Sequence, residues 1–330
     1  MATAALADIS PIASFPQHFF LENLAVRADG SILVTVLNHK QLWYVPAPDG
    51  SQPVTPVLVH TFDGIAMGIV ETEPDIFYVS TVGHATLERF DMRGWVPGAP
   101  VTPTRVLTFG QPAGLNGACL LSRRVILLAD SLAGLIWRVD LTDDGLTATA
   151  SVWLRHHTMA PDPDSGFTSP LGPQPGINGI RFAARTNVVY YTCTARKLFM
   201  RMSVDPATHT PVGQPEVVAS DISADDFCLD ENVGVAYLTT HTANTIVRVP
   251  INAGTEGATT CVVAGDPFTE QLVGPSSAAW RRGPADYGRI AYVTTDGGHT
   301  AIAYHRPGSD GIIRPAQVVR VQFDPERPAR

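Results

Sequence analysis

Short apolar runs separated by polar turns recur along this chain, and patterns with helical periodicity are scarce. The runs are rich in β-branched and aromatic residues and are bounded by Gly, Pro, Asp or Asn, as is typical of strands. A polar start, an apolar strand, a turn and a second strand appear six times. The second strands read SILVTV, DIFYVST, RVILLADS, NVVYYTCT, GVAYLTT and RIAYVTT. Repetition at a period of roughly 45 to 60 residues predicts a propeller or another repeat array.

Each second strand leads through a polar turn to a third strand, and most repeats add a weaker outer strand. The third strands read KQLWYV, ATLERFD, GLIWRVD, KLFMRMSV, NTIVRVPI and TAIAYHR, the last covering residues 300–306. The pattern predicts an all-β fold, a six-bladed β-propeller with four antiparallel strands per blade. We expect one domain over residues 1–330. The C-terminal AQVVRVQF and the N-terminal DISPIASF are expected to close the ring within one blade.

Two connections interrupt the period. Residues 155–176 form a long link between the third and fourth repeats, and residues 93–103 form a shorter Pro/Gly loop. Long loops in compact domains are usually functional or disordered. Each connection is therefore either a lid over the mouth of the propeller or a plain surface excursion.

Charge and composition limit the classes of binding partner. The chain has 330 residues, 45% of them hydrophobic, and a net charge of −8 without a basic run, which argues against nucleic acid and anionic membranes. The N-terminus does not resemble a signal peptide, and no apolar run reaches the roughly 18 residues of a membrane span. The four cysteines lack paired spacing, which favours a reduced, cytoplasmic protein. We expect a monomer or homodimer.

A propeller brings residues from all repeats to one end of its axis. If every inner strand starts at one face, the loops between second and third strands lie at that face too. The mouth ring, defined as the first residue of each repeat, then comprises Glu22, Met67, Asn116, Asn178, Asp225 and Ser276. The loops add Asn38, His39, His84, Ser131, Thr194, His241, Thr242, Asp296 and His299. Because unpaired buried polar groups are costly, this convergence indicates a ligand, a metal or ordered water.

The first residues of the repeats also carry a family resemblance that covers nearly the whole chain. Glu22, the Asn-Gly pairs at Asn116 and Asn178, and the Asp225-Asp226 pair resemble the SMP-30/gluconolactonase/luciferin-regenerating-enzyme group of six-bladed propellers. The resemblance implies that Glu22, Asn178 and Asp225 hold a divalent cation and that Asn116 contacts substrate. Oxygen ligands of this kind suit Ca²⁺, Mg²⁺ or Mn²⁺.

The flanking residues depart from the gluconolactonase pattern. Asn23-Leu24 stands where that group has Gly-Pro, Gly117 stands in place of Asp, and Asp226 replaces Gly. The run ENLAVRADGSILVT resembles a divergent, mostly fungal branch linked with natural-product pathways. That branch includes hetero-Diels–Alder cyclases that join a tropolone-derived quinone methide to a humulene-type olefin.

The favoured hypothesis is a secondary-metabolite cyclase that needs no cofactor and holds two small apolar substrates face to face. A hydrogen bond to the heterodiene carbonyl would lower the barrier. The candidate catalytic residues are His84, His241, His299 and Asp225. The candidate substrate-binding residues are Met67, Asn116, Phe20, Ser276, Trp280 and Phe167.

Two alternatives remain. A metal-dependent lactonase or esterase would use the cation to polarise a carbonyl and Asp225 or Asp226 as general base. A non-catalytic propeller that binds a protein on its face ranks last, because no apolar surface run or charge block supports it. The chain has no G-x-S-x-G motif and no glycine-rich phosphate loop.

Overall fold

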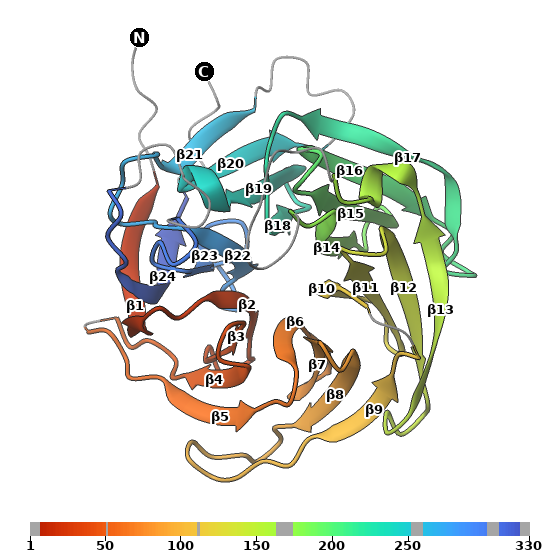
Figure 1. Cartoon of the computed structure of the whole chain (residues 1–330), viewed down its shortest axis with the longest axis horizontal. Coiled ribbons are helices and arrows are strands. Elements are labelled where there is room, and N and C mark those ends of the chain that lie inside the picture. Colours follow the sequence, from red (N-terminus) through yellow and green to blue (C-terminus); the bar gives the residue numbers. More distant parts are fainter. Residues whose placement is uncertain are drawn as a thin grey trace.

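Six four-stranded antiparallel sheets surround a central axis, as the repeat pattern predicts (Figure 1). The structure, a computed structural model, describes residues 7–50, 52–110, 113–162, 174–251, 260–301 and 310–323. Blades one to three are β2 (Leu21–Val26), β3 (Ile32–Val36), β4 (Gln41–Val45) and β5 (Val57–Thr61); β6 (Ile65–Glu73), β7 (Ile76–Val82), β8 (Thr86–Asp91) and β9 (Thr104–Thr108); and β10 (Leu115–Ser122), β11 (Val125–Asp130), β12 (Leu135–Leu141) and β13 (Ala148–Arg155).

The other three blades complete the ring. They are β14 (Ile177–Ala183), β15 (Val188–Cys193), β16 (Leu198–Val204) and β17 (Pro211–Ser220); β18 (Phe227–Asp230), β19 (Val235–Thr240), β20 (Thr245–Pro250) and β21 (Cys261–Gly265); and β22 (Pro275–Trp280), β23 (Ile290–Thr295), β24 (Pro315–Gln322) and β1 (Asp8–Gln17). The described helices are two 3₁₀ turns, η1 (His157–Met159) and η2 (His241–Ala243). Within the described ranges, no helix has the length and hydropathy needed to cross a membrane.

Blade six joins the two ends of the chain. Its strand order is β1-β24-β23-β22, and the register runs from Asp8 opposite Gln322 to Gln17 opposite Pro315. The predicted closure within one blade is confirmed. The prediction of a third strand at residues 300–306 is wrong, because β24 pairs directly with β23 and takes that position.

Side-chain hydroxyls on second strands, together with Ser276 of the inner strand β22, tie neighbouring inner strands to one another. In blade one, Thr35 Oγ1 accepts from the backbone N–H of Asn23 (3.0 Å) and donates to the carbonyl of Met67 in blade two (2.7 Å). The donated bond recurs from Thr192 to the Asp225 carbonyl (2.6 Å), from Thr239 to the Ser276 carbonyl (2.8 Å) and from Ser276 to the Leu21 carbonyl (2.5 Å). These bonds hold the first residues of the inner strands beside one another around the axis.

Glycine follows the ring residue in three inner strands, as Gly68, Gly117 and Gly179, and permits this close approach. A Cβ on Gly117 would lie 2.5 Å from the carbonyl oxygen of Asn178 in the next blade. A Cβ on Gly179 would lie 2.3 Å from Oδ1 and 2.7 Å from Cα of Asp226. Any larger residue therefore forces the neighbouring blades apart.

The hydrophobic core fills the spaces between neighbouring blades. Leu127 and Ile136 of blade three pack in one cluster with Tyr191 and Met200 of blade four, all at most 1% exposed. Sheets packed face to face exclude water from both faces, which explains why the second strands are nearly continuous apolar runs. Cys119 and Cys228 are buried, and all four cysteines are free thiols.

The two irregular connections lie at different ends of the axis. Residues 93–103 lead from β8 to β9. The N–H of Met92, just before them, donates to the carbonyl of Asp75 in the turn between β6 and β7. Since β6 starts at the mouth and ends at this turn, the loop lies at the face opposite the mouth. The lid hypothesis is therefore wrong for that loop. The longer connection leads from β13 to the start of β14 at the mouth. Its residues 163–173 lie outside the described residues, and its flank is anchored by the fully buried Met159.

We expect Gly179→Ala to lower the free energy of unfolding by about 1–3 kcal/mol, because the added methyl meets the Cα and the carboxylate of Asp226, which four hydrogen bonds hold in place. Urea denaturation measures the change. Gly110→Ala is the matched control, since a Cβ there has no atom within 4 Å. Equal stability of the two variants would contradict the close approach of the inner strands.

Candidate active site at the mouth of the propeller

The mouth ring is assembled as expected. Glu22, Asn116, Asn178 and Asp225 are all buried although their side chains are polar, with 4–9% of their surface exposed. They stand at the starts of β2, β10 and β14 and just before β18, so they come from four blades. The side chain of Asn178 hydrogen-bonds that of Asp225, and Glu22 and Asp225 lie in each other's electrostatic field. The site therefore concentrates two carboxyl groups and two carboxamides away from water.

Burial changes the acidity of both ring carboxyl groups. Burial, followed by the nearby charge of Asp226, raises the pKa of Glu22 from 4.5 to about 8. Burial, followed by the charges of Glu22 and Asp226, raises the pKa of Asp225 well above 3.8, against the effect of the Asn178 hydrogen bond. Desolvation and like charges both disfavour ionisation. The pair therefore favours a bound proton or a bound cation at neutral pH.

Asp226 closes the axis one residue below the mouth ring. Its Oδ2 receives hydrogen bonds from Arg181 Nη2 (2.6 Å), Ser277 Oγ (2.7 Å) and Asn23 Nδ2 (3.3 Å), and its Oδ1 accepts from the N–H of Phe227 (2.8 Å). Four blades thus meet at one carboxylate. Asp226 stands out in the sequence as a second acidic residue beside Asp225, whereas the roles of Arg181 and Ser277 were not predicted. Their shared signal is a polar residue one to three positions after a ring residue.

His241 and Asp296 form a second polar pair at the mouth. Nε2 of His241 lies 3.2 Å from Oδ2 of the fully buried Asp296, which also accepts from the N–H (3.0 Å) and Oγ1 (2.6 Å) of Thr300. Phe20 stacks on the imidazole at a centroid distance of 5.3 Å and an interplanar angle of 6°. Asp296 also contributes to the raised pKa of Asp225, so this pair faces the ring. Phe20 and His241 are thus brought to the predicted site.

The other candidate histidines lie farther out. The ring of His299 makes an edge contact with His18 at 5.9 Å, and burial lowers its pKa. Within the described ranges, its buried Nδ1 has no hydrogen-bond partner. His39 stacks on Phe19 at 4.1 Å. His84 is exposed in the β7–β8 turn.

The remaining substrate-binding candidates lie in different parts of the molecule. Met67 and Ser276 are buried in the mouth ring, as expected. Trp280 is not brought to the ring: it lies at the other end of β22, where its Nε1 donates to the carbonyl of Leu229 (2.6 Å). A strand of this length separates its first and last residues by the thickness of the blade. Phe167 lies outside the described residues.

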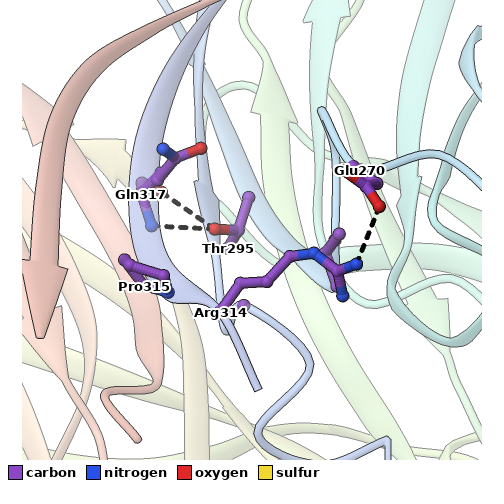
Figure 2. A pocket seen from close by; sticks show the side chains of 7 residues that line it. Glu270, Thr295, Arg314, Pro315 and Gln317 are labelled. Carbon is purple, nitrogen blue, oxygen red and sulfur yellow. Dashed lines mark hydrogen bonds and ion pairs between the residues drawn. The ribbon is translucent and has the colours of Figure 1, made fainter. Parts of the chain in front are cut away.

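A small cavity of about 160 Å³ opens beside blade six at the mouth face (Figure 2). Its polar groups are already paired: Arg314 Nη2 donates to Glu270 (3.0 Å), and the N–H of Gln317 donates to Thr295 Oγ1 (2.9 Å). This cavity is therefore a weaker candidate for catalysis than the ring.

The family resemblance predicts that Glu22, Asn178 and Asp225 hold a cation. In the described part of the chain, no group of three or more His, Cys, Asp and Glu side chains is arranged to hold a metal ion. The expected set differs from such a group because one of its members is a carboxamide. Its buried, mutually repelling carboxyl groups and its oxygen donors fit a hard divalent cation such as Ca²⁺, Mg²⁺ or Mn²⁺.

Comparison with known proteins supports the fold. No family model and no curated protein matches this sequence. A luciferin-regenerating enzyme is similar over 96% of this chain and 95% of its own, with 13% identity and a TM-score of 0.67. Regucalcin from Agrobacterium tumefaciens, a calcium-binding protein, is similar over 100% of both chains (14% identity, TM-score 0.62). A proposed gluconolactonase is similar over 96% of this chain and 92% of its own (14% identity, TM-score 0.60). At these identities the similarity shows the fold alone.

With divalent cations removed by EDTA, we expect the protein to lose stability as the pH rises from about 5 to 8. The native state keeps a proton on Glu22 that the unfolded chain has released, because the pKa of Glu22 is about 8 in the fold and 4.5 outside it. Glu22→Gln removes this contribution and flattens the decline in urea denaturation at a series of pH values. The exposed Glu216→Gln is the control. Identical pH profiles for wild type and Glu22→Gln would contradict the assignment.

Proposed function

We propose that this protein is a biosynthetic enzyme that catalyses an intermolecular hetero-Diels–Alder cycloaddition at the mouth of the propeller. The substrates are a quinone methide-type heterodiene and a terpene olefin, in a fungal secondary-metabolite pathway of the tropolone sesquiterpenoid kind. The observation that carries the proposal is the buried pair Glu22 and Asp225, whose raised pKa values keep protons available beside the apolar Met67.

A buried neutral carboxyl group is a strong hydrogen-bond donor to a carbonyl. Negative charge develops on the heterodiene oxygen as the new bonds form, and Glu22 or Asp225 would stabilise it by donating a hydrogen bond. His241, oriented by Asp296 and by stacking on Phe20, offers a second donor at the same face. Preorganised donors of this kind contribute about 3 kcal/mol each in a water-excluded site.

The cycloaddition itself needs orientation rather than a nucleophile. Holding two partners in reactive contact can contribute about 7–11 kcal/mol of the barrier. The residues of the ring are compatible with a reaction that needs no nucleophile, because no activated nucleophile is present among them. Ser276 Oγ is hydrogen-bonded to the carbonyl of Leu21. Burial raises the pKa of the Cys119 thiol, which follows Asn116 on β10, to about 12.

We expect the EDTA-treated protein to form cycloadduct from a quinone methide precursor and humulene faster, and with higher stereoselectivity, than the buffer alone. Glu22→Gln should reduce the rate by about tenfold or more, because it removes the acidic proton but keeps the shape of the side chain. Chiral chromatography of the products measures both effects. Glu216→Gln should behave as wild type. Cycloadduct formed no faster and no more selectively than without protein would exclude the proposal.

A divalent-metal-dependent lactonase or esterase is the second candidate, favoured by the oxygen donors of Glu22, Asn178 and Asp225. The solved structures with this fold include a calcium-binding regucalcin and a proposed gluconolactonase. A bound cation would supply a polarised lactone carbonyl and a more acidic water. Asp226 is a poor general base for this reaction, since four donors already bond its carboxylate.

If the lactonase proposal is correct, Asp225→Asn abolishes both Mn²⁺ binding and the hydrolysis of γ- and δ-lactones, because it removes one of two anionic ligands. Calorimetric titration with Mn²⁺ and a pH-stat assay measure the two effects. Asp63→Asn is the control, because the Asp63 side chain is 76% exposed and pairs with Arg105 rather than with a ring residue. Unchanged metal content and lactone turnover in Asp225→Asn would end this proposal while leaving the cyclase proposal open.

A further inference from the structure

A cavity of about 320 Å³ lies at the end of the axis opposite the mouth. It is lined by the later residues of the inner strands β2, β6, β10, β14 and β22, and therefore by five of the six blades. Leu24, Ile69, Leu120, Phe182 and Trp280 supply apolar surface. Pockets of this size and lining are typical of sites for small organic molecules.

This cavity is separate from the mouth site. Asp226 lies between them, and Arg181 on the cavity side bonds to it at 2.6 Å. Ser277 and Asn23 complete the closure of the axis from two other blades. A ligand in the lower cavity would therefore contact none of the mouth-ring side chains.

The charged groups of the cavity favour an anion. Its lining includes two arginines, Arg181 and Arg282, and one carboxylate, Glu71, whereas the Asp226 carboxylate that pairs with Arg181 is 3% exposed and does not line the cavity. Arg181 uses Nη2 on Asp226 and Nη1 on the carbonyl of Ile180 (2.8 Å). Each guanidinium has five N–H donors in a planar fork, so both arginines retain donors beyond the bonds described here. Such forks bind carboxylates bidentately.

Glu71 indicates which chemical group of a ligand would bind Arg282. Arg282 extends from blade six and forms an ion pair with Glu71 in blade two, across the cavity. The Arg282 side chain is 43% exposed, whereas that of Glu71 is 10% exposed. A carboxylate on a ligand that enters the cavity would meet Arg282 from the solvent side, where Glu71 does not cover it.

We infer that the lower cavity is a second binding site, which takes a small molecule with an aromatic or alicyclic body and one carboxylate group. The body packs against Trp280, Phe182 and the aliphatic lining, and the carboxylate is held by Arg282 and Arg181. Its volume accommodates a molecule of about a dozen non-hydrogen atoms. The inference stands independently of the reaction at the mouth, because the two sites share no ligand-contacting side chain.

The first test compares 1-naphthoate with 1-naphthamide by isothermal titration calorimetry of the full-length protein. The two probes have the same ring system and differ in charge. We expect the acid to bind and the amide to bind at least about tenfold more weakly, because only the carboxylate has the charge and the two acceptor oxygens for a bidentate ion pair with a guanidinium. Equal affinities, or no binding of the acid, would overturn the inference.

Variants locate the probe. Arg282→Gln should weaken 1-naphthoate binding about tenfold or more, whereas its neighbour Arg281→Gln, which pairs with Asp286 and does not line the cavity, should leave it unchanged. Glu71→Gln should strengthen binding, because it removes the carboxylate that competes for Arg282 and keeps the side-chain oxygen that accepts from the N–H of Asp75. Binding that is insensitive to Arg282→Gln, or weakened by Glu71→Gln, would place the probe elsewhere and overturn the inference. Thermal melts of all three variants confirm that they are folded.

Discussion

The structure depends on how closely six inner strands approach one another around one axis. Each start of a strand brings unpaired backbone groups into the interior, where leaving them unbonded is costly. Side-chain hydroxyls meet this demand: Thr35, Thr192 and Thr239 each accept from their own inner strand and donate to the next. Gly117 and Gly179 keep the space between strands free for these bonds. The ring of bonds holds the blades in register, and it places the first residue of every repeat at the mouth.

The same geometry creates the chemistry of the site. Residues that are far apart in the chain become neighbours in a site shielded from water, where burial raises the pKa of both Glu22 and Asp225. The charge of Asp226 adds to the rise for both, and the charge of Glu22 adds to the rise for Asp225. Buried like charges of this kind are unfavourable for stability, and they persist where they serve a ligand, a proton or a cation. Asp226 differs from them because Arg181, Ser277 and Asn23 bond its carboxylate. The Asp226 carboxylate therefore links four blades at the axis, whereas the carboxyl groups of Glu22 and Asp225 face the mouth.

The two ends of the axis are consequently different environments. At the mouth, carboxyl groups, carboxamides and the His241–Asp296 pair converge. At the other end, arginines and aromatic side chains line a larger cavity. The division follows from the length of an inner strand. Its first residues lie at one end of the axis and its last residues lie at the other. Trp280 illustrates it, since it lies five positions after Pro275, which is at the mouth end of the same strand β22.

The sequence by itself determined the repeat, the six-bladed fold, the pairing of the chain ends in one blade and the identity of the mouth ring. These features follow from local strand patterns and from the polar residues that start each repeat, and both are visible along the chain. Only the tertiary structure decided which partners meet across blades: Arg181 with Asp226, His241 with Asp296, and Arg282 with Glu71. It also placed β24 rather than residues 300–306 beside β23, and it put Trp280 at the far end. Contacts between blades depend on the stagger and twist of neighbouring sheets, and no single repeat carries that information.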